Sequence, residues 1–344
     1  MHRKLMLGTA MLALVSALGL SAAKADDRPA ALIISQSGLG DQSYNDLAYE
    51  GFKRGLEATK LEGRPIESKE VVAQAVDILR RASDANFGLV VDLEYAHGDA
   101  LTEVAKDYPD TKYVILNQVR EGANVASVLF QEQEGSYLAG TLAALVTTDT
   151  SIKGINAEPV IGVIGGTKSA GIDKFIAGYM EGAKAANPDV KVLVAYSNNF
   201  ADPAIGLQMT KAMFEQGADI VYQIAGGTGM GVIQAAKEAG HYAIGVDTDQ
   251  DGLAPGSVLT SMIKRTDVAV EAMLKDYAAD TFPAGKTAAF GLKEGGVGLS
   301  EMKHTKELIP APILEKVETA KQDILSGKVQ VWNVVTQGYP DWLK

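Results

Sequence analysis

The chain contains no cysteine, and this absence excludes disulfides, cysteine nucleophiles and thiolate metal sites. Beyond residue 25 it has only three histidines, His97, His241 and His304, without the spacing of a metal site or a catalytic triad. No Gly-x-Ser-x-Gly segment marks a nucleophile elbow. The sequence is therefore poorly equipped for catalysis, and we expect no catalytic residues, no metal and no cofactor.

An excess of positive charge is also lacking, because 32 Lys and Arg face 43 Asp and Glu, for a net charge of −11. Such a chain would repel phosphates, so we expect no nucleic-acid partner. Aromatic residues make up only 6% of the chain, whereas glycine occurs 36 times. Small residues permit close packing of helices on sheets, which favours an α/β protein, and the net charge suits a monomer.

Long apolar runs are absent except at the N-terminus. Residues 5–22 are apolar or small, follow Arg3 and Lys4, and precede the small residues of Ala23-Lys24-Ala25. This pattern predicts a secretory signal peptide, residues 1–25, cleaved near Ala25. A membrane anchor is the alternative, although the run is short for a bilayer span. With no cysteine to carry a lipid, we expect a free periplasmic protein with a net charge of −14.

Beyond residue 25, short β-branched runs alternate with longer segments of helical period. The predicted strands are 31–35, 89–93, 113–116, 125–130, 160–164, 190–196, 220–224, 242–246 and 258–261. The predicted helices are 44–60, 72–82, 99–107, 134–146, 172–186, 203–216, 231–239 and 265–280. Alternation of apolar strands with helices predicts parallel sheets that helices cover on both faces.

The length beyond the signal peptide, 319 residues, exceeds what one core usually holds. A faint repeat supports two similar halves. Each half begins with a strand, a glycine-rich loop and a helix that carries an aromatic residue, Glu, Gly and Lys in that order, at residues 49–53 and 179–184. We therefore expect two lobes, the first beginning near Asp26 and the second near Gln131.

Ligands of open parallel sheets bind beyond the carboxyl ends of the strands. At such ends stand Asp247, an acceptor for ligand hydroxyls, and Lys264, a donor, although both also suit solvated loops. Asp247, Asp249 and Asp251 alternate as in a calcium loop. The twelfth position of that loop is Val258 instead of a bidentate Glu, so the pattern does not favour calcium.

Glycines and tyrosines at or beside strand ends have two interpretations each. Gly226 and Gly227 either let a ligand approach the backbone or form a tight turn. Neither glycine-rich loop fits a dinucleotide or phosphate-loop pattern. Tyr44 and Tyr222, one in each half, could sandwich a planar ring. Spacing alone favours a core position for Tyr222, which lies in the middle of a predicted strand.

Five segments taken together resemble the basic membrane protein family of ABC-transporter solute-binding proteins, which includes purine nucleoside receptors. The segments, in the family's order, are 38–46, 134–140, 225–229, 245–250 and 259–264. The resemblance implies a type I periplasmic-binding-protein fold, with two Rossmann-like lobes of parallel sheets joined by a hinge. It implies no catalysis and no cofactor. The expected partners are a small nucleoside-like solute and an ABC permease in the inner membrane.

The resemblance also implies how the chain divides between the lobes. The N-terminal lobe would hold residues 26–131 and about 262–296. The C-terminal lobe would hold residues 132–261 and about 297–344. A chain that crosses between lobes in this way places its hinge at the crossing points.

The resemblance further assigns ligand-contacting residues. Tyr44 and, as a less direct match, Tyr222 would clamp a base, while Asp247 and Lys264 would hold ribose hydroxyls. Nucleoside receptors carry an Asp at the end of the first strand, where this chain has Ser35-Gln36, so its base preference is expected to differ. The complete set of expected ligand-contacting residues is Ser35, Gln36, Tyr44, Asn45, Phe130, Tyr222, Gly226, Gly227, Asp247 and Lys264.

Other functions remain open at this point. A receptor for a sugar or sugar derivative, or a sensor outside transport, would use the same fold. A transcription regulator core shares the architecture but needs a DNA-binding helix-turn-helix, and the export signal stands in its place. An enzyme acting on nucleosides is a further alternative, which product formation would reveal.

Overall fold

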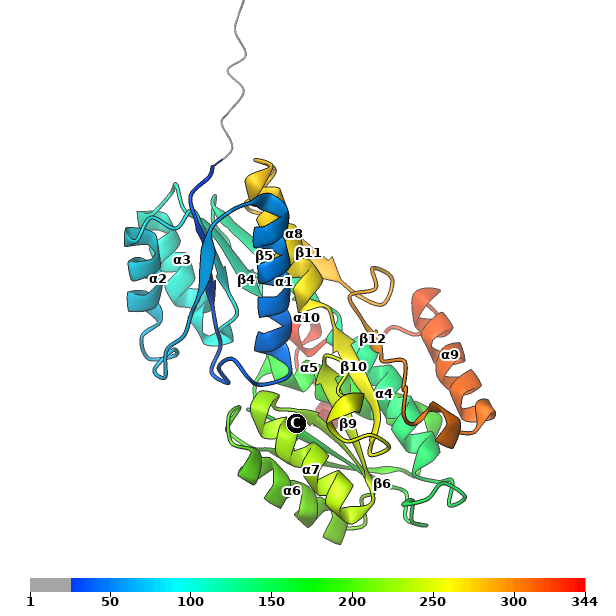
Figure 1. Ribbon diagram of the computed structural model, residues 1–344. Helices are drawn as coiled ribbons and strands as arrows, with labels where there is room; N and C mark the ends of the chain where they lie inside the picture. The colour runs from blue at the N-terminus through cyan, green and yellow to red at the C-terminus, as the bar shows by residue number, and fades with distance from the viewer. Residues whose placement is uncertain (1–25, 344) are drawn as a thin grey trace, which may run out of the picture.

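The computed structural model describes residues 26–343, so the predicted signal peptide, residues 1–25, lies outside the described part. Two α/β lobes stand one above the other, each built on a six-stranded sheet (Figure 1). Between residues 26 and 343 no helix is both long and apolar enough to cross a membrane.

The first sheet has the strand order β11-β5-β4-β3-β1-β2, and all of its neighbours are parallel. Its strands are β1 (Ala30–Ile33), β2 (Gly63–Ile66), β3 (Leu89–Asp92), β4 (Lys112–Leu116), β5 (Val125–Phe130) and β11 (Thr287–Phe290). Its helices are α1 (Tyr44–Thr59), α2 (Ala75–Asp84), α3 (Gly98–Asp107) and α8 (Thr266–Ala278). Helices α2 and α3 cover one face, while α1 and α8 pack together on the other (Figure 1).

The second sheet has the order β12-β10-β9-β8-β6-β7 and is parallel except for the short β12. Its strands are β6 (Val160–Gly165), β7 (Lys191–Tyr196), β8 (Ile220–Ile224), β9 (Tyr242–Asp247), β10 (Val258–Lys264) and β12 (Val297–Leu299). Its helices are α4 (Glu132–Val146), α5 (Ala170–Ala186), α6 (Pro203–Glu215), α7 (Gly229–Ala239), α9 (Ala311–Leu325) and α10 (Val334–Gln337). The predicted parallel α/β architecture is confirmed.

The chain crosses between the two sheets at three points. The chain leaves the first sheet after Phe130, returns to it after Lys264, and leaves again between β11 and β12. Strand β10 stays in the second sheet as far as Lys264, which is longer than the predicted strand 258–261. Backbone hydrogen bonds join the crossing segments to one another, from Gln131 N to Phe290 O and from Arg265 N to Gly296 O.

The sequence missed the edge strands β2, β11 and β12 and the helices α9 and α10. Strand β2 reads Gly-Arg-Pro-Ile, and Pro is tolerated there because the strand lies at the edge of its sheet. The strands β11 and β12 have only four and three residues and are partly exposed. Edge strands this short carry no long apolar run, so their sequence pattern does not predict a strand.

The glycine shared by the two repeated segments has a packing role. A Cβ on Gly51 of α1 would lie 2.1 Å from the backbone oxygen of Asp267 in α8. A Cβ on Gly182 of α5 would lie 2.0 Å from the backbone oxygen of Tyr137 in α4. Real Cβ atoms do not come so close, so each glycine lets two helices touch on the face of its sheet. The glycine recurs in the repeat because both lobes pack two helices closely at this position.

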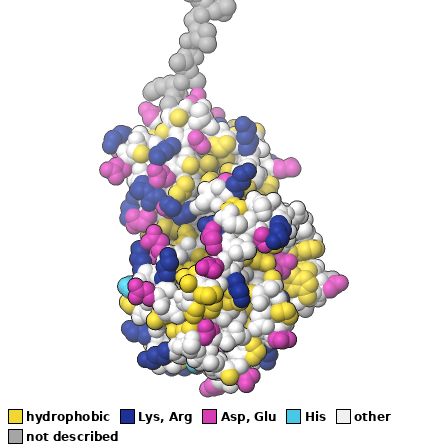
Figure 2. Space-filling view, turned by 90° about the vertical axis from the view of Figure 1, so that its right-hand side faces the viewer, with side chains coloured by type: hydrophobic (Ala, Val, Ile, Leu, Met, Phe, Trp, Pro, Cys, Tyr) yellow, Lys and Arg dark blue, Asp and Glu magenta, His cyan; other side chains and the backbone are white. Residues whose placement is uncertain are grey.

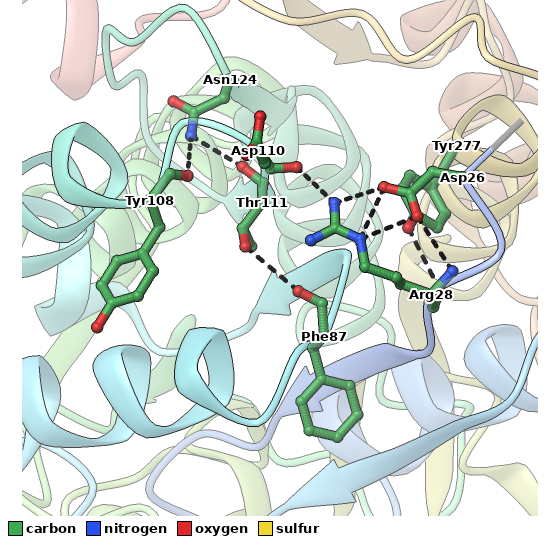
Figure 3. Close-up of polar contacts among 8 residues, drawn as sticks. All are labelled: Asp26, Arg28, Phe87, Tyr108, Asp110, Thr111, Asn124 and Tyr277. Atoms are coloured by element: carbon green, nitrogen blue, oxygen red, sulfur yellow. Dashed lines mark hydrogen bonds and ion pairs between the residues drawn. The ribbon is translucent and has the colours of Figure 1, made fainter. Parts of the chain in front are cut away.

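A polar cluster fixes the amino ends of the first sheet. Arg28 pairs with Asp26 and donates to Asp110 O, and Tyr277 donates to Arg28 O, which ties α8 to the chain just before β1 (Figure 3). Asn124 donates to the carbonyl oxygens of Tyr108 and Thr111 in the same region. This cluster lies at the amino ends of parallel strands. The carboxyl ends, where ligands bind, therefore belong to the opposite end of the lobe.

The charged side chains are mixed on the face that Figure 2 shows. Acidic and basic groups are interspersed there, and hydrophobic side chains lie between them without a continuous basic patch on that face. This face therefore offers no continuous basic track to a polyanion.

Candidate ligand-binding site

A cavity of about 230 Å³ lies between the lobes, at the carboxyl ends of strands from both sheets. The first lobe contributes Ser35, Gln36, Ser37, Tyr44, Leu93, Glu94, Tyr95, Ala96 and Asn117. The second lobe contributes Thr167, Ser169, Gly171, Ile172, Phe175, Phe200, Ile224, Gly226, Val246, Asp247 and Lys264. The volume suits one small molecule, and apolar walls with a few polar groups are typical of small-molecule sites.

Six of the ten expected residues line this cavity. They are Ser35, Gln36, Tyr44, Gly226, Asp247 and Lys264. They come from loops that are far apart in the sequence, and the two parallel sheets bring them together at one end, as the strand-end rule predicts.

Tyr222 does not line the cavity, and its assignment as the second clamp is wrong. Its side chain has no exposed surface, lies 5.2 Å from the Tyr179 ring between centroids, and shares a hydrogen bond of 3.2 Å with Ser136. Tyr222 sits in the middle of β8, where its side chain points into the core beneath α4 and α5. The core position that spacing favoured is the one observed.

Three further expected residues lie behind the cavity wall. Asn45 is fully buried and organises the first loop, because its Nδ2 donates to Ser37 Oγ and Gly38 O and its Oδ1 accepts from Ser35. Phe130 is buried and stacks on Phe290 at 5.6 Å, where the chain crosses between lobes. The third residue, Gly227, packs against the backbone of the loop that carries Phe200. Their roles in this structure are positional.

Asp247 is the acidic residue that the second lobe contributes to the cavity wall. Its carboxylate is buried and accepts a 2.6 Å hydrogen bond from Ser43 Oγ, which belongs to the other lobe. Burial raises the pKa of Asp247 to about 6, although Lys264 and the Ser43 hydroxyl act in the opposite direction. A carboxylate so poorly solvated is a strong acceptor for any hydroxyl that a ligand brings.

Lys264 belongs to a buried charge cluster at the crossing points. Its Nζ lies 2.9 Å from Glu132 Oε1, while Lys174 Nζ lies 2.5 Å from Glu132 Oε2 and also donates to Phe130 O. Burial opposes ionisation of Glu132, but the two lysines outweigh it and hold the pKa of Glu132 below its ordinary value. Lys264 is thereby held at the cavity as a compensated cation.

Aromatic rings surround the Lys264 ammonium. Its Nζ lies 5.0 Å from the centroid of Tyr44, 5.1 Å from that of Phe130 and 5.4 Å from that of Phe175. Distances under about 6 Å give favourable cation–π contacts. Because an ammonium has three donors and Glu132 takes one, Lys264 can still donate to a ligand.

The aromatic residues of the second lobe that line the cavity, Phe175 and Phe200, were not expected from the sequence. Phe200 stands in the loop after β7, and its carbonyl accepts from Thr228 N, so the loop is tied to the glycine-rich turn that contains Gly226. A Cβ on Gly166 would lie 2.1 Å from the Phe200 ring, so glycine is required there for the ring to take this place. The available signal was an aromatic residue in a polar loop after a predicted strand, in a chain where aromatics are scarce.

Two polar residues of the first lobe were also missed. Glu94 follows β3 and is 2% exposed, and Asn117 follows β4. Both come directly after strands that the sequence predicted, so the rule applied to Asp247 and Lys264 would have found them. Ser35-Gln36 lacks the carboxylate that nucleoside receptors carry there, but Glu94 brings a carboxylate to the cavity from a neighbouring loop.

Backbone geometry marks three of the cavity residues. Asn117, Gly226 and Asp247 have φ angles of 70°, 53° and 67°, and each stands at or just after the end of a strand. Asn and Asp adopt this left-handed conformation more readily than other side chains, and Gly adopts it freely.

The two lobes touch on either side of the cavity. Ser43 donates to Asp247 across the interface, and Gln250 Nε2 donates to Gln42 O. On another side, Tyr95 of the first lobe packs near Gly171 of the second, where a Cβ would lie 3.4 Å from the Tyr95 ring. The cavity is therefore bounded by contacts between lobes.

Comparisons with known proteins agree with this geometry. A family model described as ABC transporter substrate-binding protein PnrA-like matches residues 29–332. The chain is 33% identical over 326 residues to a CD4+ T-cell-stimulating antigen of Listeria innocua, covering 89% of this chain and 88% of that protein. It is 32% identical over 336 residues to an ABC transporter nucleoside-binding protein, BmpA, of Lactococcus lactis, covering 92% of each.

Among solved structures, an ABC transporter solute-binding protein from Aeropyrum pernix K1 superposes with a TM-score of 0.80 at 27% identity, covering 89% of this chain and 93% of that one. The predicted periplasmic-binding-protein fold is thus confirmed, as is the resemblance drawn from the five segments. Proteins of this kind bind solutes for ABC transporters and are not enzymes. The chain belongs to the PnrA-like, or Bmp, family of ABC-transporter substrate-binding proteins.

Proposed function

We propose that this chain is the periplasmic receptor of an ABC importer for nucleosides. One observation carries the proposal: a single cavity holds aromatic side chains from both lobes together with the buried carboxylate of Asp247. A nucleoside combines a planar base with a hydroxylated sugar, and this cavity offers a partner to each part. The nucleoside-binding relative from Lactococcus lactis supports the same assignment.

The aromatic residues would hold the base. Tyr44 comes from the first lobe and Phe200 from the second, and both line the cavity. Base stacking on an aromatic side chain contributes about 1–3 kcal/mol per base. Tyr44 is fixed in place because its hydroxyl donates to Leu93 O and accepts from Asn117 Nδ2. Phe200 thus takes the role that the resemblance gave to Tyr222.

Asp247 and Lys264 would hold the sugar. The carboxylate can accept from a hydroxyl pair, and Lys264 retains donors beside it. Hydrogen bonds to a charged partner are about twice as strong as neutral ones, and a buried site strengthens them further. The sugar hydroxyls would replace part of the solvation that burial takes from Asp247.

Closure of the two lobes around the ligand would prepare it for transport. A ligand that touches both walls would stabilise the closed arrangement, in which the lobes rotate about the three crossing segments at 130–132, 264–266 and 290–297. The joined surface of the two lobes would then engage the permease in the inner membrane. Residues 1–25 would direct export, so that capture takes place in the periplasm.

Isothermal titration calorimetry tests the proposal. Purified protein would first be freed of copurifying ligand by unfolding and refolding, and then titrated with nucleosides, free bases and monosaccharides. We expect nucleosides to bind, and to raise the melting temperature by mass action. If a sugar binds and none of the nucleosides binds, the proposal is overturned and the sugar-receptor alternative is favoured.

A further inference from the structure

Lys174 is a buried cation that lies behind the wall of the cavity. It belongs to α5 and is 2% exposed, and the next residue, Phe175, lines the cavity whereas Lys174 does not. An ammonium buried without a partner is very costly, so the group needs compensation where it stands. Glu132 at the start of α4 provides it, with 2.5 Å between Lys174 Nζ and Glu132 Oε2, and Lys174 Nζ also donates to Phe130 O at 2.9 Å.

The carboxylate of Glu132 is divided between two lysines. Its Oε1 lies 2.9 Å from Lys264 Nζ, while its Oε2 faces Lys174 from the other side. The two lysines hold the pKa of Glu132 below its ordinary value against the effect of burial. Because Lys174 compensates part of the Glu132 charge, Lys264 keeps part of its own charge for the cavity that it lines.

The charges of this network balance. Glu132 and Asp247 supply two negative charges, Lys174 and Lys264 supply two positive ones, and all four residues are at most 6% exposed. Burial raises the pKa of Asp247 to about 6, Lys264 acts to lower it, and Glu132 acts to raise it. Removal of any one of these charges should therefore change the protonation of the carboxylates that remain.

The titratable groups around the network either are neutral or have partners of their own. Asp41 of the first lobe acts to raise the pKa of Asp247, but its carboxylate is held by three backbone N–H groups. Burial raises the pKa of Tyr44 and Tyr222 well above the ordinary value, so both hydroxyls stay neutral. Asp173 of α5 accepts from two tyrosine hydroxyls. The balance beside the cavity is therefore set by the two lysines and the two carboxylates.

We propose that Lys174 is a positioning residue of the ligand site, which occupies one oxygen of Glu132 so that Lys264 keeps its charge and its donors for ligand hydroxyls. The inference rests on the proposed function where it names the hydroxyls, but the charge balance exists in the ligand-free protein. Without Lys174, Glu132 and Asp247 would compete for Lys264. One of the two carboxylates would then take up a proton at a higher pH.

Carbon-13 NMR of the ligand-free protein, labelled at the side-chain carboxyl groups of Asp and Glu, tests this balance. The signals are assigned with Asp247→Asn and Glu132→Gln. In Lys174→Met we expect the protonation midpoint of Glu132 or Asp247 to rise by about one pH unit, because a nearby opposite charge lowers a carboxyl pKa by about 1–3. In Glu132→Gln we expect the midpoint of Asp247 to fall, because Lys264 then compensates Asp247 alone.

The double variant Glu132→Gln/Lys174→Met distinguishes charge from packing. It removes one charge of each sign, so adding Lys174→Met to Glu132→Gln should move the Asp247 midpoint much less than one pH unit. The double variant should also fold if Lys174→Met alone does not, because no carboxylate has then lost its lysine. Unchanged midpoints in folded Lys174→Met, or an equal shift with and without Glu132, would overturn the inference. Failure of both variants to fold would also overturn it, since Lys174 would then have a purely structural role.

Lys211→Met is the matched control, because Lys211 Nζ lies 2.8 Å from Glu238 Oε2 at the surface between α6 and α7. It should leave the carboxyl midpoints and ligand binding unchanged. In calorimetry with adenosine, guanosine and uridine at pH 7, Lys174→Met should weaken each nucleoside that binds the wild type by about tenfold. Unchanged affinity would overturn the positioning role. If none of the three binds the wild type, the proposed function fails, while the carboxyl titrations still decide the role of Lys174.

Discussion

The two walls of the cavity offer different chemical groups to a ligand. The second lobe carries charge, in Asp247 and Lys264, and the apolar surfaces of Phe175 and Phe200. The first lobe carries oriented acceptors, in Gln36, Glu94 and Asn117, around the ring of Tyr44. The second wall is suited to holding a hydroxylated group strongly, and the first to distinguishing one planar group from another.

The two walls also differ in whether their polar groups have partners inside the protein. In the second wall, Lys264 pairs with Glu132, and Asp247 accepts a hydrogen bond from Ser43. In the first wall, Asn117 Oδ1 has no partner within the described part of the chain. Affinity is therefore expected to depend mainly on the second wall and selectivity on the first. The following predictions separate the two.

The largest effect is expected from Asp247→Asn. Asparagine keeps the size and tolerates the left-handed backbone of this position, but it removes the charge that would bind sugar hydroxyls. We expect nucleoside affinity to fall about 100-fold, equally for all bases, in titration calorimetry. A variant that binds normally would show that the second wall does not hold the sugar.

The same variant should unfold no more easily than the wild type near neutral pH. Folding raises the pKa of Asp247 from 3.8 to about 6, so the folded state holds this proton more tightly than the unfolded state. The ionised carboxylate therefore reduces stability as the pH rises through that window. Removing it should leave the melting temperature of the ligand-free protein unchanged or raise it. A marked drop would mean that the affinity loss reflects misfolding.

A pair of aromatic substitutions comes next in size. Phe200→Ala removes a ring that lines the cavity, and we expect affinity to fall about 10-fold or more from lost stacking. Tyr222→Phe removes only the hydrogen bond to Ser136 in the core, so it should cost about 1 kcal/mol of stability and leave affinity unchanged. Loss of binding in Tyr222→Phe with normal binding in Phe200→Ala would show that Tyr222, and not Phe200, stacks on the base.

Acid should weaken binding by a few-fold per pH unit. Ligand hydroxyls that donate to Asp247 stabilise its ionised form, so binding lowers its pKa and releases a proton. Affinity should therefore rise between about pH 5 and pH 7, and calorimetry in buffers of different ionisation enthalpy should detect proton release. The Asp247→Asn variant is the control, and its residual affinity should not follow this profile.

The smallest effect is expected from Ser43→Ala. Ser43 joins the walls by donating to Asp247, and its hydroxyl helps to hold the pKa of that carboxylate down against burial. Removing it should weaken binding by about 2-fold at most near neutral pH and shift the pH profile to higher pH. A profile that shifts to lower pH would show that the hydroxyl does not stabilise the carboxylate.

Local sequence was sufficient for much of the framework. Apolar runs such as 125–130 and 220–224 marked strands correctly to the residue, because buried parallel strands need continuous apolar side chains. The short edges β2, β11 and β12 escaped because pairing with a neighbour, and not their own composition, makes them strands.

The residues of the site were likewise predicted only in part. Asp247 and Lys264 were found because they stand where a strand ends, and a parallel sheet gathers such ends at one edge. Tyr44 begins α1, after the loop that follows β1, and the family resemblance marked it. Glu94, Asn117 and Phe200 stand at equivalent places and were passed over. No rule of spacing distinguishes a loop residue that faces the cavity from one that faces solvent.

The sequence by itself determined two α/β lobes, strand ends that meet at one site, and the family of the chain. Only the tertiary structure decided which aromatic residue faces the cavity, because Tyr222 is turned into the core by its place in β8 while Phe200 is held at the wall by Gly166 and Thr228. The physical reason is that alternation and apolar runs are local properties. The direction of a side chain depends on packing partners that are distant in the sequence.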